Sequence, residues 1–227
     1  IMRSTLIQTG ILLDVDNTPR LELNPEDDKI RNVLNLIQSF FIGANVKGGR
    51  CFKELYDQLT MPEHGIGMKC GVIPIFIAVV LHHYKKNMII KHNNTEEKIT
   101  PNLLNDINEN PQDYSIILEN WSEEKAEFIK GLETIFSEFI IEREKAYNSF
   151  TYIVLAMKRW YMSLPKYTKE IEHIYCGKNS FKPISKSKKR FINSLKQINN
   201  NPREYLFEKI FSIFGMNNFS IDLVDNI

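Results

Sequence analysis

The sequence predicts a mainly α-helical fold, in which a winged-helix-like N-terminal part with a small β-hairpin precedes a helical bundle. Apolar residues recur at helical spacing along most of the chain from Pro25 onward. Segments with β-prone or alternating residues are few and short. Hydrophobic residues make up 43% and charged residues 25% of the 227 residues, as in folded globular chains.

The first 24 residues contain two short segments with apolar character. Residues 4–13 are mixed and partly apolar, and residues 20–23 alternate polar with apolar side chains. Asn17-Thr18-Pro19 between them is typical of a turn. A small hairpin and a helix followed by a strand are both compatible with this pattern.

A strong helix signal begins at Pro25. Proline suits the first helical position, Asn24 before it can serve as the N-cap, and the acidic residues 26–28 lie in the first turn. Apolar side chains then recur at helical spacing as far as Phe41. Gly43 is expected to end this helix.

Two more helices and a hairpin follow. Residues 51–59 are predicted to form a short helix. Residues 71–85 are predicted to form another, with Pro74 in its opening turn and apolar residues on nearly all sides, so we expect it to be buried. Residues 87–90 and 98–100 flank a polar turn, which indicates a β-hairpin. Three helices and a hairpin in this order are the layout of a winged helix-turn-helix.

The second half of the chain is predicted to be helical after a short strand at residues 115–118. Ser122 is expected to cap a long helix. Further helices are predicted over residues 149–164, 186–198 and 202–214. The helix that Ser122 is expected to cap has a continuous apolar stripe of Phe128, Leu132, Ile135, Phe136, Phe139 and Ile140.

The chain is long enough for two domains. We expect a winged-helix-like region with an N-terminal hairpin at residues 1–120 and a helical bundle at residues 121–227, with the boundary near Asn120. The formal net charge is +1, so any attraction to nucleic acid must come from a local basic patch.

Cysteine usage and hydropathy predict a cytoplasmic protein without a membrane partner. Cys51, Cys70 and Cys176 are odd in number and unevenly spaced, which is typical of reduced thiols. The longest apolar run, residues 72–81, is far shorter than the roughly 20 residues of a membrane-spanning helix. Because Ile1 precedes the first Met, we expect a domain cut from a larger protein.

One motif is similar to a catalytic one. Asp14-Val15-Asp16-Asn17-Thr18 matches the nucleophile motif of haloacid-dehalogenase-type phosphatases, in which the first carboxylate attacks phosphorus and the second is a general acid. That chemistry also needs a parallel sheet, a downstream Lys and a late acidic pair that holds Mg²⁺, and the helices predicted after residue 24 do not supply the sheet. A polar turn closed by Pro19 is favoured over a phosphatase centred on Asp14 and Asp16.

Other site motifs are incomplete. Residues 43–50 have the glycine spacing of a phosphate-binding P-loop but lack the Lys and the Ser or Thr that contact phosphate and Mg²⁺. His173 and Cys176 lie three apart, yet the chain has no paired ligands at the spacing of a zinc site. We therefore predict no catalytic residue, no cofactor and no metal site.

The most informative charge pattern lies between Lys178 and Lys196, where basic and apolar residues alternate without any acidic residue. A basic amphipathic helix there could bind a phosphate backbone. Two structural alternatives remain: an ordinary solvated face, or docking on the chain's acidic stretch, which contains Asp106, Glu109, Asp113, Glu119, Glu123 and Glu124. The candidate residues for binding nucleic acid or a partner are Lys182, Lys186, Lys188, Lys189 and Arg190.

Residues 61–75 resemble a segment of large bacterial ATP-binding proteins of the P-loop, phage-defence type. In those proteins Pro-Pro-Tyr-Gly-Ile precedes a Gly-Val-Ile-Pro helix, and this chain has Gly71-Val72-Ile73-Pro74 but Glu63-His64 in place of Pro-Tyr. Looser similarity covers residues 4–10, 164–168 and 201–207. The nucleotide site of that family lies in another region, so the resemblance implies an accessory or coupling domain and transfers no site residue.

These observations leave three functional hypotheses. The first is a non-catalytic coupling module that contacts other domains of its parent protein or a protein partner in an ATPase assembly. The second is a DNA-binding module that uses the winged helix and the basic segment 178–196. The third and most remote is a phosphatase centred on Asp14 and Asp16.

Overall fold

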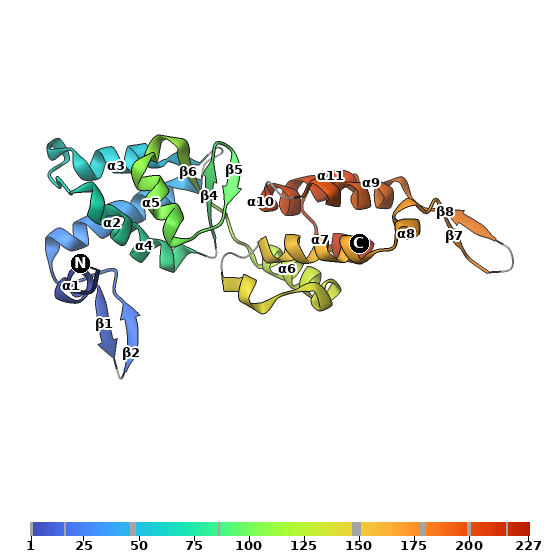
Figure 1. The fold of residues 1–227 in the computed structure, drawn as a ribbon, viewed down its shortest axis with the longest axis horizontal. Helices are drawn as coiled ribbons and strands as arrows, with labels where there is room; N and C mark the ends of the chain where they lie inside the picture. Colours follow the sequence, from blue (N-terminus) through green and yellow to red (C-terminus); the bar gives the residue numbers. More distant parts are fainter. Residues whose placement is uncertain are drawn as a thin grey trace. The chain divides into compact units, whose positions relative to one another are not determined.

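The computed structural model describes residues 2–15, 17–45, 49–85, 87–146, 151–177, 180–198, 201–216 and 218–227. The chain is mainly α-helical, as predicted, and its strands form three small sheets among the described residues. It consists of two compact units, unit 1 (residues 1–120) and unit 2 (residues 121–227). Figure 1 shows the course of the chain through both.

Unit 1 begins with a helix and a hairpin. Helix α1 (Met2–Gln8) is followed by the antiparallel strands β1 (Leu12–Val15) and β2 (Thr18–Leu21), as Figure 1 shows. The N-terminal segment therefore contains both of the structures that its sequence allowed, one after the other.

The helix predicted from Pro25 is helix α2 (Asp28–Ile42), and the predicted cap at Asn24 is wrong. Asp27 is the N-cap, because its carboxylate accepts hydrogen bonds from the backbone N–H groups of Lys29 at 2.8 Å and Ile30 at 3.1 Å. An Asp side chain can satisfy two of the free amides of a first turn, so the helix begins after it.

The remaining helices of unit 1 are α3 (Phe52–Thr60), α4 (Ile73–Tyr84) and α5 (Pro101–Glu109). Pro74 lies in the opening turn of α4, as predicted, where no intrahelical partner for its nitrogen is needed. Thr100 caps α5 by accepting a hydrogen bond from the N–H of Leu103.

Four antiparallel strands form the main sheet of unit 1, in the order β3-β6-β4-β5. Their bounds are β3 (Arg50–Cys51), β4 (Met88–His92), β5 (Thr95–Glu97) and β6 (Tyr114–Leu118). The β4–β5 hairpin was predicted, but its second strand is Thr95–Glu97 and not residues 98–100. Asn93 and Asn94 both have positive φ, which is typical of a tight two-residue turn. The second strand therefore begins at Thr95, directly after this turn.

The core of unit 1 lies between α2, α3, α4 and the sheet. Phe40 of α2 and Phe52 of α3 are fully buried, with ring centroids 6.0 Å apart. Residues of α4 and of strands β4 and β6 complete this core, among them Ile77, Val80, Met88, Ile90 and Ile116. Burial of each large side chain of this kind contributes roughly 1.5 to 3 kcal/mol.

Unit 2 is a set of helices with one small hairpin. Its helices are α6 (Glu123–Ile135), α7 (Thr151–Ser163), α8 (Lys166–Glu170), α9 (Lys186–Ser194), α10 (Pro202–Glu204) and α11 (Ile210–Ile213), with the π-helix η8 (Tyr205–Lys209) between the last two. Strands β7 (His173–Tyr175) and β8 (Phe181–Pro183) form the hairpin. Short 3-10 turns in the two units are η1 (Gly43–Asn45), η2 (Pro62–His64), η3 (Cys70–Val72), η4 (Pro111–Asp113), η5 (Ser137–Phe139), η6 (Glu142–Ala146), η7 (Leu195–Gln197) and η9 (Ile221–Asn226).

Aromatic side chains form the core of unit 2. Phe128 of α6 lies 5.4 Å from Phe211 and 5.4 Å from Phe219, measured between ring centroids. Ser122 caps α6 as predicted, by accepting from the N–H of Lys125. The predicted apolar stripe is interrupted, because α6 ends at Ile135, which is 43% exposed.

Candidate nucleic-acid interface

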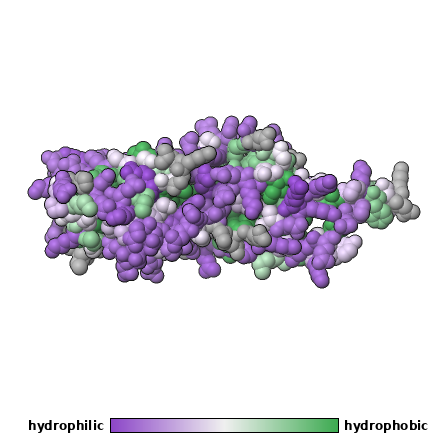
Figure 2. All heavy atoms as spheres, turned by 90° about the horizontal axis from the view of Figure 1, so that it is seen from above, coloured by the Kyte–Doolittle hydropathy of each residue, from purple (hydrophilic) through white to green (hydrophobic). Residues whose placement is uncertain are grey.

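The β7–β8 hairpin exposes side chains that are usually buried. Its register pairs His173 with Pro183, Ile174 with Lys182, and Tyr175 with Phe181. Ile174 is 52% exposed, Tyr175 58% and Phe181 63%. In Figure 2, the part of unit 2 that carries this hairpin shows hydrophobic atoms among hydrophilic ones. Exposed apolar groups that are grouped in this way mark binding sites more often than isolated ones do.

The pairing separates the hairpin side chains onto two faces. Directly opposite residues of an antiparallel pair share a face, and neighbours along a strand alternate. One face therefore carries His173, Tyr175, Phe181 and Pro183, and the rings of Tyr175 and Phe181 are 5.4 Å apart. The opposite face carries Ile174 and Lys182.

Backbone hydrogen bonds extend this ladder at both ends. At the base, the N–H of Ile184 donates to the carbonyl of Glu172 at 2.9 Å. Towards the tip, the N–H of Cys176 donates to the carbonyl of Ser180 at 2.8 Å, and Gly177 adopts a positive φ of 86°. These bonds hold the aromatic face in a defined geometry.

The sequence did not predict this hairpin. Its strands are only three residues long, which is too short for a period-2 pattern to be recognised. The available signal was weak: the β-prone residues Ile174, Tyr175 and Phe181 flank a segment that contains Gly177.

Helix α9 follows the hairpin directly and is attached to the bundle by one face. Phe191 and Leu195 are buried, and the ring of Phe191 lies 5.9 Å from that of Phe214. The Ser194 hydroxyl is 2.6 Å from the Tyr205 hydroxyl, and burial raises the pKa of Tyr205 to about 12. The phenol is therefore neutral and able to donate or accept this hydrogen bond at physiological pH.

The exposed surface of α9 carries the predicted basic residues, and at 100° per residue Lys186 and Arg190 share one face while Lys188 lies on another side. Lys186, Lys188 and Arg190 are exposed. Lys189 lies 3.3 Å from the Glu172 carboxylate, so this ion pair joins α9 to the residue that precedes β7. An exposed pair of this kind contributes about 0 to 1 kcal/mol, so its main effect is to neutralise Lys189.

The structure corrects the prediction of one basic helix over residues 178–196. Helix α9 begins only at Lys186, where Ser185 caps it by accepting from the N–H of Lys188. Lys182 lies on strand β8. Pro183 explains the difference, because proline has no N–H to donate and disfavours a helical conformation at the residue before it. Lys178 lies outside the described residues.

The acidic stretch that was considered as a docking surface is divided between the two units. Asp106 and Glu109 lie on α5 of unit 1, whereas Glu123 and Glu124 begin α6 of unit 2. Docking of the basic residues on this stretch stays a prediction.

The phosphatase-like motif lacks its structural setting in the described residues. Asp14 lies exposed on β1, opposite Pro19. All strand pairs in the described part of the chain are antiparallel, so the parallel sheet that presents such a nucleophile is not among them. Asp16 lies outside the described residues.

The remaining candidates for chemistry are dispersed. Gly43 ends α2, and the rest of the P-loop-like segment is partly outside the described residues. Cys51, Cys70 and Cys176 are free thiols. Within the described ranges, no three His, Cys, Asp or Glu side chains gather closely enough to hold a metal ion. The helices in those ranges are also too short or too polar to cross a membrane.

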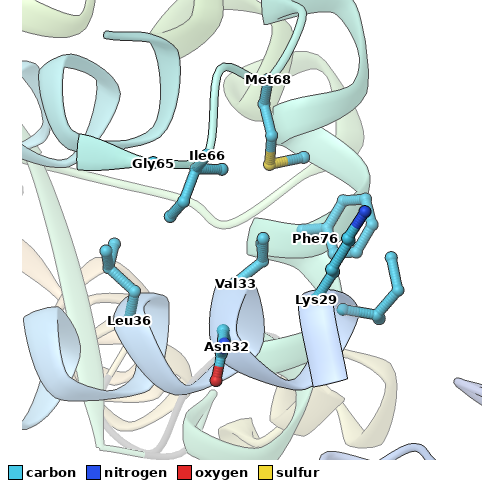
Figure 3. Close-up of a pocket in the computed structure, with 9 residues that line it drawn as sticks. Lys29, Asn32, Val33, Leu36, Gly65, Ile66, Met68 and Phe76 are labelled. Carbon is cyan, nitrogen blue, oxygen red and sulfur yellow. The ribbon is translucent and has the colours of Figure 1, made fainter. Parts of the chain in front are cut away.

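Unit 1 contains a groove of about 700 Å³ that the sequence did not predict. Figure 3 shows Val33 and Leu36 of α2 on one side, Ile66 and Met68 of the α3–α4 loop on the other, and Phe76 of α4 beside them. A backbone hydrogen bond of 2.7 Å from the Met68 N–H to the Leu59 carbonyl holds the loop. This lining suits apolar side chains and supplies no acid–base pair.

The described residues thus offer two surfaces for binding: the basic face of α9 with the adjoining hairpin, and the apolar groove of unit 1. Positive charge beside open aromatic rings can hold phosphates and bases together. Comparison of the chain with models of known protein families, with curated proteins and with solved structures gave no match.

Proposed function

We propose that this chain is a non-catalytic binding module of a larger protein, and that unit 2 binds the phosphate backbone of nucleic acid through α9. The observation that carries the proposal is the exposed basic surface of α9, on which Lys186 and Arg190 share one face and Lys188 lies on another side. The sequence contains no Asp or Glu from His173 to Arg203. The basic residues of α9 therefore have no acidic neighbour in sequence nearer than Glu172 on one side and Glu204 on the other.

Charge and geometry both favour this function. The whole chain has a formal net charge of only +1, so the basic face of α9 is a local feature and not a share of a general positive charge. Lys186 and Arg190 are one helical turn apart, about 6 Å along the axis, and project from a helix that is fixed to the bundle. A rigid row of cations loses little conformational entropy when it binds phosphates.

The first prediction concerns reversal of these charges. The variant K186E/K188E/R190E is expected to lose binding to a labelled duplex DNA in fluorescence anisotropy titrations. If wild-type α9 contacts three phosphates, log Kd should rise with log salt with a slope of about 2.7, which is about 40-fold between roughly 50 and 200 mM. The slope of the variant should fall towards zero.

A matched control keeps the total charge change and moves its position. K69E/K130E/K209E reverses three exposed lysines outside α9 and the hairpin and should leave most of the affinity intact. Equal losses in the two variants would show that only net charge matters. Absence of binding by the wild type at low salt would reject the proposal.

A second candidate function, contact with a protein partner in an ATPase assembly, is favoured by unit 1. The order α2, β3, α3, α4 and β4 supports a winged-helix-like interpretation, although α5 separates β5 from β6, and it is β6 that pairs with both β3 and β4. Helix α4, in the position of a recognition helix, is mostly buried and therefore poorly suited to reading bases. The resemblance to phage-defence ATP-binding proteins implies the same coupling role.

A pull-down with the remaining domains of the parent protein tests this second function. A Met68→Glu substitution places a charge in the apolar groove and should reduce capture if the groove is the contact. Unchanged capture would reject the groove as the interface.

A further inference from the structure

We propose that the β7–β8 hairpin makes unit 2 prefer single-stranded nucleic acid, with Tyr175 and Phe181 stacking on unpaired bases while α9 holds the backbone. This inference rests on the proposed binding of nucleic acid by α9 and deepens it by naming the class of ligand.

The composition of the aromatic face suits bases. His173, Tyr175 and Phe181 carry flat π-systems, and Pro183 adds a compact apolar ring on the same face. The rings of Tyr175 and Phe181 are tilted by 58° to each other, and more than half of each side chain is exposed, so each ring has surface available to a separate base. Stacking on such rings is tolerant of sequence because every base has a π-face.

The cations that follow the hairpin in the chain favour a nucleic acid as its ligand. Lys186 begins α9 three residues after Pro183 of the aromatic face, whereas Lys182 faces the opposite side of the hairpin together with Ile174. An apolar protein surface alone would not use the exposed cations of α9, whereas a nucleic-acid strand presents bases and phosphates at alternating positions. The combination of stacking rings on the hairpin and cations on the helix that follows it is typical of single-strand binding sites.

The geometry also argues against a paired duplex as the preferred ligand. In a duplex, the faces of the bases are covered by their neighbours, so a ring can reach them only after unstacking costs of a few kcal/mol. An unpaired strand exposes these faces at little cost. The hydrogen bonds at the base and tip of the hairpin keep the rings in position before the ligand arrives.

The experiment compares three labelled probes in anisotropy titrations with the whole chain: oligo-dT, oligo-U and a duplex DNA of equal length. We expect the wild type to bind one or both single strands more tightly than the duplex. Phe181→Ala and Tyr175→Ala should each weaken single-strand binding by about five- to a hundred-fold, the range for loss of one stacked base, and change duplex binding less than twofold. Comparison of oligo-dT with oligo-U distinguishes DNA from RNA as the source of the bases.

Two further variants test stacking directly. Ile174→Ala removes an apolar side chain from the opposite face of the same hairpin and should leave single-strand affinity unchanged. Phe181→Leu keeps an apolar side chain without a ring and should lose affinity as Phe181→Ala does, whereas Phe181→Tyr should retain it. Full affinity of Phe181→Leu, or an equal loss in Ile174→Ala, would show a general apolar contact and overturn the inference.

The outcomes also separate this inference from the function on which it rests. Equal affinity for duplex and single strands, lost in K186E/K188E/R190E but not in Phe181→Ala, would overturn the hairpin proposal and keep binding by α9. Absence of binding to all three probes would overturn both.

Discussion

At the scale of single residues, Gly49 has the most demanding environment in unit 1. It precedes β3 and has a φ of +73°, a conformation that side chains with a Cβ rarely adopt. A Cβ at this position would lie 2.3 Å from the carbonyl oxygen of Ile116 on β6. The glycine therefore allows the chain to pass close to β6 just where β3 begins to pair with it.

We predict that Gly49→Ala destabilises unit 1. Positive φ and the clash with backbone each cost of the order of 1 to 3 kcal/mol, so the midpoint of urea unfolding, followed by far-UV circular dichroism, should fall clearly. Gly71→Ala is the control, because no atom lies within 4 Å of a Cβ there, and it should leave the midpoint nearly unchanged. Similar midpoints for the two variants would show that the β3–β6 approach is not tight.

At the scale of elements, α4 demonstrates how burial decides the role of a helix. Ile73, Ile77 and Val80 are fully buried, and Phe76 is 3% exposed. The exposed residues His82 and His83 lie at its C-terminal end. A helix that is covered in this way packs a core, and its surface offers few donors or acceptors to the major groove.

We predict that truncation of α4 lowers stability without a specific effect on DNA sequence recognition. Phe76→Ala should lose about 3 to 5 kcal/mol of unfolding free energy and Val80→Ala a smaller amount, because each leaves a cavity in the core. His83→Ala on the exposed end of the same helix should change the free energy by less than about 0.5 kcal/mol. Unaltered unfolding of Phe76→Ala, together with loss of sequence-specific DNA binding, would show that α4 reads DNA.

At the scale of the whole molecule, each of the two units has its own hydrophobic core among the residues that the structure describes. The core of unit 1 is contributed by residues between Leu6 and Ile116. In unit 2, close approach of Gly131 on α6 and Val224 of η9 brings the C-terminal segment onto the same aromatic cluster. Each unit is far longer than the roughly 40 residues below which a domain needs other support.

We therefore predict that residues 1–120 fold when produced alone. Far-UV circular dichroism should show helix, and urea should unfold this fragment in one cooperative transition. Both tryptophans, Trp121 and Trp160, lie in unit 2, so circular dichroism is the suitable probe. A fragment without a cooperative transition would contradict an independent core in unit 1.

Local sequence signals predict much of the helical architecture. Helical periodicity and capping residues such as Ser122 were sufficient to predict the mainly helical content and the start of α6, because these signals act within a few residues. The burial of α4 followed from its nearly continuous apolar composition. The basic residues of α9 are exposed, as expected for charged side chains on a helix that packs by its apolar side. Their binding partner stays a prediction.

Tertiary contacts fix the placement of β6 between β3 and β4 and the pairing of β7 with β8. Strand order depends on contacts between residues far apart in sequence, such as Arg50 with Ile116, which no local pattern contains. The hairpin depends on hydrogen bonds across a turn, and its three-residue strands are too short to produce a periodic signal. That pairing places Tyr175 against Phe181, and this arrangement underlies the proposed preference for unpaired bases.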